Sequence, residues 1–212
     1  MDRFKRVKSL FGENSFKKLS GSKVLLLGVG GVGGFCLDAL FRTGVSQITV
    51  VDFDRFELSN QNRQIGSEAV GEYKVAHLKT LYPSIIPICA KIDKEWIESF
   101  DFSKFDLIID AIDDLSAKAL LPFFIENSKF ISSMGGAKKI DPTQIKIDSI
   151  WNTKGDPLAK KFRSVLRKSG FNGDFEVVYS SEVMKIEELG SFVGVTGSFG
   201  LTLASLAIKK LL

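Results

Sequence analysis

The feature that most constrains the fold is a cluster of glycines that directly follows an apolar segment. Residues 23–28 read KVLLLG, residues 28–34 read GVGGVGG, and a second apolar run extends over 32–43. This order predicts a buried strand, a phosphate-binding turn and a helix, because small residues let backbone N–H groups approach a phosphate at a helix N-terminus. The alternative is that the glycines serve only a tight turn and close helix packing.

Strands and helices continue to alternate after this turn. We expect strands at 47–52, 85–92, 105–113 and 129–136, and helices at 73–82 and 117–128. This alternation predicts an α/β fold with a doubly wound, Rossmann-like, mainly parallel sheet.

The pattern changes after about residue 137, which predicts an α+β extension at the C-terminus. We expect a half-exposed strand at 143–150, a capped basic helix at 156–170, a loop with a short strand at 171–183 and an apolar terminal helix. With 212 residues and 44% hydrophobic composition the chain can bury one core. We predict a single domain, 1–212, made of an N-terminal arm (1–22), a nucleotide-binding core (23–136) and the extension (137–212).

Composition limits the cellular compartments and the classes of partner that suit this chain. The basic start lacks an apolar signal-peptide core, and the late apolar stretch is shorter than the roughly 20 residues that span a bilayer, so we expect no membrane partner. Cys36 and Cys89 lie in apolar segments, which fits a reducing cytoplasm. The sequence contains no pair of Cys-x-x-Cys motifs that could bind zinc. The net charge of +4 permits a nucleic-acid partner without requiring one.

A carboxylate follows the second predicted strand at a spacing suited to ribose recognition. Asp52 lies about 22 residues after Gly30. A nicotinamide or flavin dehydrogenase and an ATP-using enzyme both fit this spacing. The next segment, VDFDRFELSNQNRQIG, favours ATP, because a dehydrogenase has no evident use for so many polar groups beside the ribose site.

Several polar residues are candidates for the phosphates. They are Asn60, Asn62, Arg63, Gln64 and Lys74. Arginine offers a planar fork of donors, amides can serve the remaining oxygens, and lysine adds a point charge. The alternatives are that the two asparagines are turn residues and that the lysine is solvated.

Asp113 ends a predicted strand at the sheet edge where α/β proteins bind ligands, so it can hold Mg²⁺ against the phosphates. Alternatively, Asp113 or Asp114 caps the helix that follows. His77, the only histidine, is expected to be structural or on the surface.

These motifs together resemble the ubiquitin-activating enzyme superfamily, whose pattern of G-x-G-G-x-G, D-x-D, S-N-x-x-R-Q, a lysine and an I-D pair is matched from Arg3 to Asp113. The resemblance implies an ATP site formed by Gly28, Gly30, Gly31, Gly33, Asp52, Asp54, Asn60, Arg63, Gln64 and Lys74. It also implies Mg²⁺ on Asp113 and catalytic roles for Arg6, Asn60, Arg63, Lys74 and Asp113. RFKR near the start is similar to an arm whose second arginine enters the partner's site, which implies a homodimer in which Arg6 acts in trans.

Within the superfamily, the second half resembles the tRNA threonylcarbamoyladenosine dehydratases. The residues that carry this resemblance are SMGGAKKIDPTQIKIDSIWNTKGDPLAKKFRSVLRK, followed by SSE and VTGSFG. It implies adenylation of the threonine carboxylate of the modified adenosine next to the tRNA anticodon, closure of its side chain into a ring, and release of AMP and pyrophosphate. The extension would then bind tRNA and form the dimer. Where the family commonly has histidine and alanine, this chain has Gly66 and Ser67, and we assign that position no role.

A basic cluster in the extension is a candidate for tRNA phosphates, with a solvated helix face as the alternative. It contains Lys154, Lys160, Lys161, Arg163, Arg167 and Lys168, opposed mainly by Asp156; the tRNA-binding residues we name are Lys160, Lys161, Arg163 and Arg167.

Two other functions remain open. One is activation of the C-terminal glycine of a ubiquitin-like sulfur carrier, although the zinc cysteines usual in such enzymes are missing. The other is a non-enzymatic nucleotide-binding regulator, which the intact Arg6, Arg63, Lys74 and Asp113 argue against. An activating or sulfur-relay protein partner is also compatible with the resemblance.

Overall fold

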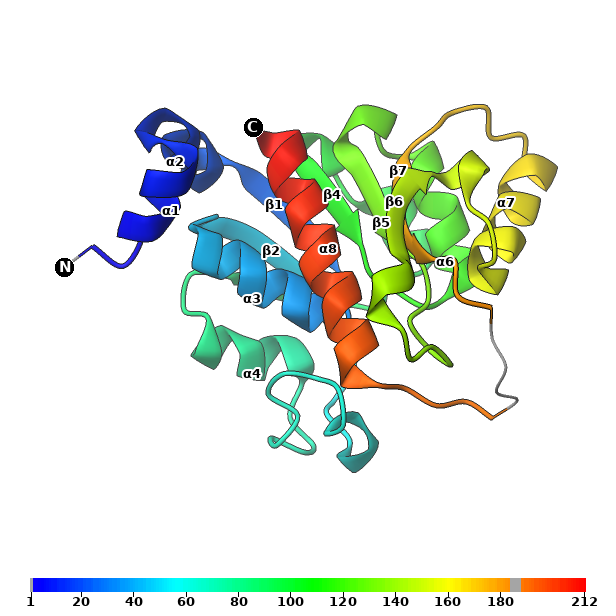
Figure 1. The fold of residues 1–212 in the computed structure, drawn as a ribbon, viewed down its shortest axis with the longest axis horizontal. Helices are drawn as coiled ribbons and strands as arrows, with labels where there is room; N and C mark the ends of the chain where they lie inside the picture. Colours follow the sequence, from blue (N-terminus) through cyan, green and yellow to red (C-terminus); the bar gives the residue numbers. More distant parts are fainter. Residues whose placement is uncertain (1, 184–187) are drawn as a thin grey trace.

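Seven strands form one sheet within residues 2–183 and 188–212, the parts of the chain that the computed structural model describes (Figure 1). The strands are β1 (Lys23–Leu27), β2 (Gln47–Val51), β3 (Ile86–Ile88), β4 (Leu107–Asp110), β5 (Phe130–Ser133), β6 (Ile145–Ser149) and β7 (Glu176–Ser180). Their order is β3-β2-β1-β4-β5-β7-β6. Only the β6–β7 pair is antiparallel, which confirms the predicted mainly parallel α/β sheet.

The strand order reverses at β1, which lies between β2 and β4. Leu27, the last residue of β1, is in register with Val51 of β2 and Asp110 of β4. The carboxyl ends of these three strands therefore meet at one edge, at the switch point where doubly wound folds bind ligands.

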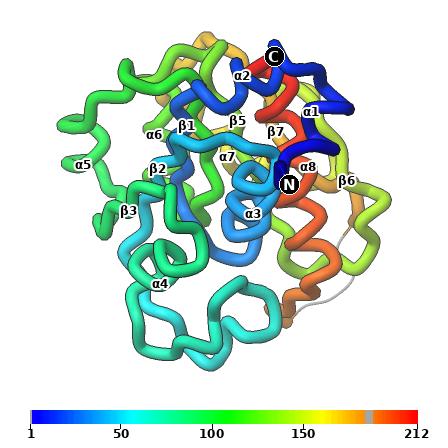
Figure 2. Tube along the Cα trace, turned by 90° about the vertical axis from the view of Figure 1, so that its left-hand side faces the viewer, coloured from blue at the N-terminus to red at the C-terminus, as the bar shows by residue number. Residues whose placement is uncertain are grey.

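The helices are α1 (Lys5–Phe11), α2 (Glu13–Gly21), α3 (Gly33–Thr43), α4 (Lys74–Leu81), α5 (Lys94–Ser99), α6 (Leu115–Leu120), α7 (Pro157–Lys168) and α8 (Val193–Leu211). Those from α3 onward lie on the two faces of the sheet, while α1 and α2 lie at one end of it (Figures 1 and 2). Alternate residues of β1 enter two cores: Val24 and Leu26 pack in the core that holds α3 and α8, while Leu25 and Leu27 pack in the core that holds α6 and α7. A strand buried on both faces reads as continuously apolar, which is why KVLLLG stood out.

The apolar C-terminal helix belongs to the core. Val195, Phe199 and Leu203 of α8 are fully buried, and a Cβ added at Gly200 would overlap with the carbonyl oxygen of Val32 at the start of α3. The helix lies across the sheet beside α3 (Figure 1). No helix in the described part of the chain has the length and hydropathy needed to cross a membrane.

The N-terminal arm is helical and is folded onto the end of α3 (Figure 2). The ring of Phe16 lies 5.2 Å from that of Phe4, and Gly44 leaves the space that Phe16 fills, because a Cβ there would lie 2.5 Å from the ring. Of the two cysteines, Cys36 is buried, which raises the pKa of its thiol, and Cys89 is exposed.

Three elements differ from the expectation, and the position of a fourth is defined by the sheet. The helix expected at 117–128 ends at Leu120, and a 3₁₀ turn follows, because Pro122 has no N–H to continue the helix. The strand expected at 85–92 is limited to Ile86–Ile88, and α5 was not expected at all. The short strand expected in 171–183 is β7, an internal strand between β5 and β6.

Candidate functional site

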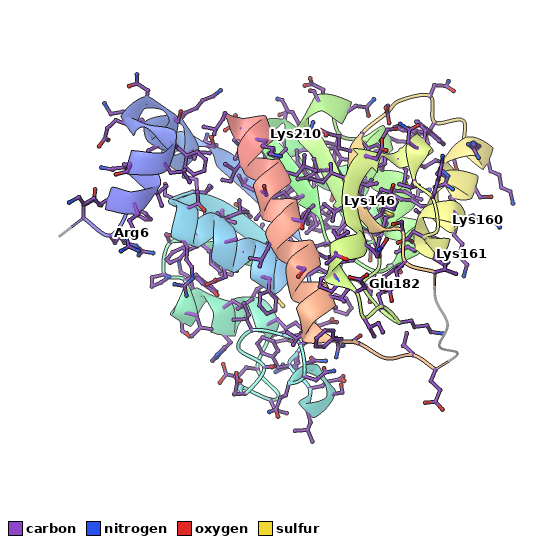
Figure 3. All side chains as sticks on the ribbon, in the orientation of Figure 1. Arg6, Lys146, Lys160, Lys161, Glu182 and Lys210 are labelled. Carbon is purple, nitrogen blue, oxygen red and sulfur yellow. The ribbon has the colours of Figure 1, made fainter. Side chains whose placement is uncertain are left out.

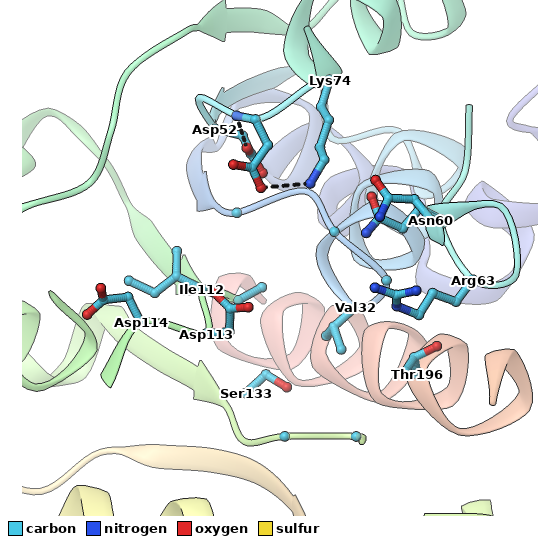
Figure 4. A pocket seen from close by; sticks show the side chains of 18 of the residues that line it. Val32, Asp52, Asn60, Arg63, Lys74, Ile112, Asp113, Asp114, Ser133 and Thr196 are labelled. Carbon is cyan, nitrogen blue, oxygen red and sulfur yellow. Dashed lines mark hydrogen bonds and ion pairs between the residues drawn. The ribbon is translucent and has the colours of Figure 1, made fainter. Parts of the chain in front are cut away.

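A pocket of about 580 Å³ opens at the carboxyl ends of the parallel strands (Figure 4). The glycine turn after β1, the segment after β2, the loop after β4 and the turn after β5 line it. Of the residues predicted to bind ATP or metal, it brings together Gly28, Gly30, Gly31, Asp52, Asp54, Asn60, Arg63, Gln64, Lys74 and Asp113.

The glycine turn allows close backbone approach at two positions. Gly28 has φ +84, its N–H donates to Val51 at 2.9 Å, and an added Cβ would lie 2.9 Å from the carbonyl oxygen of Ala111. An added Cβ at Gly31 would lie 3.2 Å from the side chain of Arg63. Glycine is therefore required at position 28, because of its positive φ and the Ala111 carbonyl, whereas a side chain at position 31 would require Arg63 to shift.

Gly33 does not line the pocket, in contrast to its predicted place among the ATP-binding residues. An added Cβ would overlap with the carbonyl oxygen of Gly28, so this glycine lets the first turn of α3 pack against the loop. The alternative of close helix packing therefore applies to Gly33.

Asp52 is buried, with 8% of its surface exposed, at the end of β2. Its two carboxylate oxygens accept backbone N–H groups from Val29 and Asp54, each at 2.9 Å. Burial raises the pKa of Asp52, while these two hydrogen bonds act in the opposite direction. The carboxylate is thus tied to the glycine turn and held at the wall of the pocket.

Lys74 is a buried lysine at the first position of α4, so the alternative of a solvated surface lysine is wrong. Its Nζ lies 2.9 Å from Oδ2 of Asp54, and the backbone N–H of Lys74 donates to the carbonyl oxygen of Asp54 at 2.9 Å. The side chain of Asp54 is 48% exposed and that of Lys74 is 6% exposed. The ammonium is therefore aimed at the pocket by a carboxylate that solvent or a ligand can reach (Figure 4).

The SNQNRQ segment begins in the 3₁₀ turn Leu58–Asn60, and its side chains have different roles. Asn60 is buried and accepts the N–H of Glu57 at 3.1 Å, so it shapes the turn while also lining the pocket. Arg63 donates to the Ser59 carbonyl at 2.8 Å and is half-buried at the pocket wall. Asn62 instead donates to Ser191 at 3.3 Å and does not line the pocket.

Gln64 has an unpaired acceptor. Its Oε1 is buried and has no hydrogen-bond partner within residues 2–183 and 188–212, and its amide nitrogen would lie 3.8 Å from a Cβ at Gly30. A buried amide oxygen without a partner is costly unless a ligand or water completes it.

Both neighbouring aspartates after β4 line the pocket, but only Asp114 also caps the helix that follows. Asp114 caps α6, accepting the N–H groups of Ser116 and Ala117 at 2.7 and 3.0 Å. Asp113 lines the pocket and is exposed, and in the described part of the chain it makes no hydrogen bond or ion pair. No group of three or more His, Cys, Asp or Glu side chains occurs there either. A single carboxylate suits Mg²⁺ that takes its other ligands from phosphates and water.

Arg6 lies outside this pocket. It is exposed on α1, at the opposite side of the molecule from the basic helix α7 (Figure 3).

The predicted tRNA-binding residues divide into two groups. Lys160 and Lys161 are exposed on α7 (Figure 3). Arg163 is half-buried and donates to Thr153 instead of pointing to solvent, and burial lowers its pKa. The guanidinium of Arg167 lies 5.2 Å from the ring of Trp151. Asp156, the acidic residue expected to oppose this cluster, is buried at the N-cap of α7, and its charge acts on Arg163.

Sequence reasoning missed one wall of the pocket. The end of β5 and the turn after it, residues 133–136 and together called the turn 133–136, line it with Lys91 and with Thr196 of α8. The glycines of SMGG, at the end of the strand predicted for 129–136, were a usable signal for the turn. Nothing in the sequence around Thr196 indicates that α8 reaches the site.

Comparison with known proteins gives the family. Residues 4–211 match the ThiF family. The chain belongs to the ThiF family. A Bacillus subtilis tRNA threonylcarbamoyladenosine dehydratase is 36% identical to this ThiF-family chain over 193 residues, which cover 86% of this chain and 76% of the relative. A Haemophilus influenzae protein of the same description is 30% identical, covering 99% and 93%.

The fold of this ThiF-family chain is that of an ATP-bound relative. The structure of the Escherichia coli tRNA N6-threonylcarbamoyladenosine dehydratase TcdA in complex with ATP superposes with a TM-score of 0.91 at 30% identity, covering 99% of this chain and 93% of that one. A Haemophilus influenzae molybdopterin-synthase adenylyltransferase is 26% identical over 202 residues. The predicted family and the predicted resemblance to the dehydratases are therefore both confirmed.

Proposed function

We propose that this chain uses ATP to dehydrate threonylcarbamoyladenosine in tRNA, closing the side chain into a ring and releasing AMP and pyrophosphate. The observation that carries the proposal is the pocket at the switch point, where a glycine turn, a buried ribose-type carboxylate, a buried lysine and a free carboxylate converge in a ThiF-family chain. Because the proposed substrate is tRNA, we also propose that the protein acts in the cytoplasm.

The pocket fits a nucleoside triphosphate. The glycine turn can receive phosphates on its backbone N–H groups, and Asp52 has a second lone pair on each oxygen for ribose hydroxyls. The buried Oε1 of Gln64 lacks a partner that a ligand or an associated water would supply. Asp113 would hold Mg²⁺, which when bound neutralises phosphate charge.

The reaction requires an activated carboxylate. One oxygen of the threonine carboxylate attacks the α-phosphorus of ATP, the bond to the β-phosphate oxygen breaks, and pyrophosphate leaves. Lys74 and Arg63 line the pocket, and in this proposal they stabilise the negative charge that grows on the departing group. An atom of the same side chain then attacks the acyl carbon and expels AMP, so no protein nucleophile is required.

The exposed position of Arg6 supports a homodimer. Arg6 lies outside the pocket of its own chain, and an arginine on a projecting helical arm (Figure 1) can enter the pocket of a second copy. In that arrangement Arg6 adds a guanidinium to the pyrophosphate side of the partner's site.

The exposed face of α7 would attract the tRNA. Lys160 and Lys161 are free of ion pairs in the described part of the chain, and Lys154 and Lys168 are exposed nearby. Such a cluster adds salt-dependent phosphate affinity to the specific recognition in the pocket.

The test is direct. The protein is incubated with ATP, Mg²⁺ and threonylcarbamoylated tRNA, and the digested nucleosides are weighed by mass spectrometry. We expect the modified nucleoside to become lighter by one water, with AMP formed in equal amount. Absence of water loss, together with ATP–pyrophosphate exchange provoked by a sulfur-carrier protein, would replace the proposal with the sulfur-carrier alternative.

A further inference from the structure

A buried charged cluster lies behind the pocket wall that carries Asp113. Lys118 of α6 and Asp110 at the end of β4 form an ion pair of 2.6 Å, and neither side chain is exposed. Ser132 of β5 donates its hydroxyl to the same carboxylate oxygen at 2.6 Å. The chemistry described above uses none of these three residues.

Lys118 connects two neighbouring strand ends. Besides Asp110, its ammonium donates to the hydroxyl of Ser132 at 3.2 Å and to the carbonyl oxygen of Ser133 at 3.0 Å. An ammonium has three donors, so these bonds satisfy it completely. Ser133 opens the turn 133–136 that lines the pocket, so the lysine fixes the start of that turn to the end of β4.

Asp110 also restricts the backbone next to Asp113. Its second oxygen, Oδ1, accepts the N–H of Ile112 at 3.1 Å, one residue before Asp113. On the other side Asp114 is fixed as the cap of α6. The backbone of Asp113 is therefore held from both sides, while its carboxylate has no partner within residues 2–183 and 188–212.

A buried ion pair is an inefficient way to stabilise a fold, because desolvation offsets much of the attraction and apolar residues of similar volume can replace it. A fully satisfied buried network does fix geometry, and catalysis by positioning is sensitive to shifts of about 1 Å.

We propose that Lys118 is a positioning residue, which acts through Asp110 and Ser132 to hold the metal-binding Asp113 in register with the turn 133–136 across the pocket. The inference rests on the proposed function, because the Mg²⁺ role of Asp113 belongs to it.

The test is the gain in ATP affinity that Mg²⁺ produces. The double variant Asp110→Asn/Lys118→Met removes both charges and so avoids an unpaired buried ion. We expect ATP affinity in EDTA to stay within about twofold of wild type, and the Mg²⁺-dependent gain to fall by about tenfold. We expect kcat to fall by about 100-fold, with KM for tRNA little changed.

A second buried pair provides a matched control. Lys139 and Asp156 lie 3.9 Å apart with side chains 1% exposed, and neither lines the pocket. The equivalent double variant, Lys139→Met/Asp156→Asn, should alter thermal stability and leave the Mg²⁺-dependent gain unchanged. An equal loss of the gain in this control would mean that any buried pair has the effect, which overturns the proposal.

A milder substitution tests the proposal even if the double variant does not fold. Ser132→Ala keeps the ion pair, removes one hydroxyl, and should lower both the Mg²⁺-dependent gain and kcat by about threefold. The inference would be overturned by folded variants whose kcat and whose Mg²⁺-dependent gain in ATP affinity equal those of the wild type. It would also be overturned if Mg²⁺ did not increase the ATP affinity of the wild-type protein. A wild-type protein that shows the gain but does not dehydrate tRNA would refute the proposed function while leaving the positioning result in place.

Discussion

The nucleotide-binding core and the C-terminal extension each contain a buried aspartate with the same electrostatic signature. Asp52 in the core and Asp156 in the extension are 8% and 4% exposed, and burial raises the pKa of both. Both also accept backbone N–H groups, from Val29 and Asp54 in one case and from Ala159 in the other.

The two aspartates differ in what they face. Asp52 lines the pocket, whereas Asp156 does not and is enclosed at the start of α7, where its Oδ2 has no hydrogen-bond partner in the described part of the chain. A perturbed carboxylate is thus a sign of burial, and only access to a cavity makes it a candidate for ligand binding.

The largest expected effect is in the core. Lys74→Ala and Asp113→Ala should each lower the rate of tRNA dehydration by about 1,000-fold or more, because each removes charge stabilisation at the phosphates. The measurement is single-turnover water loss by mass spectrometry, with circular dichroism as the check on folding.

Lys94→Ala is the matched control for these two variants, because Lys94 is 75% exposed on α5 and lies outside the pocket. It should retain wild-type turnover. Retained activity in both pocket variants would mean that the site is misassigned. The distinction between a core whose charges face a ligand and an extension whose aspartate is enclosed would then fail.

The next prediction concerns the arm. If Arg6 acts in trans, Arg6→Ala and Lys74→Ala homodimers should both be nearly inactive, while mixing and re-equilibrating the two should restore activity. Half of the mixed dimers are heterodimers with one intact site each, so we expect about one quarter of wild-type turnover. A mixture as inactive as its parents would place Arg6 outside the partner's site.

A smaller effect is expected on the exposed face of the extension. Lys160→Ala/Lys161→Ala should weaken tRNA binding by about tenfold near 0.15 M salt and reduce the slope of log K against log salt by about 2, without changing ATP affinity. Filter binding across a salt series measures this.

Arg163 sharpens this comparison, since it donates to Thr153. Arg163→Ala should lower thermal stability and leave the salt slope nearly unchanged. A control pair on other faces, Lys94→Ala/Lys209→Ala, should leave tRNA affinity at the wild-type value. A loss of affinity in that pair equal to the loss in the α7 pair would show that net charge alone attracts the tRNA.

Much of the core could be predicted from the sequence, because its signals are local. The glycine turn, the carboxylate at the end of β2 and the apolar β1 strand follow one another within about 30 residues, and each has a conformational reason to be recognisable. Which of Asp113 and Asp114 caps α6, and which keeps a free carboxylate in the pocket, could not be decided from the sequence, since adjacent residues of one type share the same local pattern.

The rest depends on contacts between distant segments. Thr196 reaches the pocket only because α8 packs against α3, and Lys118 meets Ser132 only because α6 returns beneath the ends of β4 and β5. The inward turn of Arg163 likewise follows from Thr153 lying beneath it. Helical periodicity alone cannot show which basic residue of α7 has a buried partner.

The smallest effect tests the enclosed aspartate. Burial places the folded-state pKa of Asp156 above its unfolded value near 4, although Lys139 acts in the opposite direction. The folded chain therefore binds a proton more readily than the unfolded chain, and the free energy of unfolding falls as pH rises from about 4 through the raised folded value.

Asp156→Asn removes this ionisation and keeps an oxygen that can accept the N–H of Ala159. We expect the variant to melt about 2 to 4 °C above wild type at pH 7, and the difference to disappear toward pH 4. Thermal unfolding followed by circular dichroism from pH 4 to 8 measures it. A variant that is less stable at pH 7 would show that the ion pair with Lys139 outweighs the desolvation of the carboxylate. In that case the buried charges of the extension would stabilise the fold, in contrast to the charges of the core, which face the pocket.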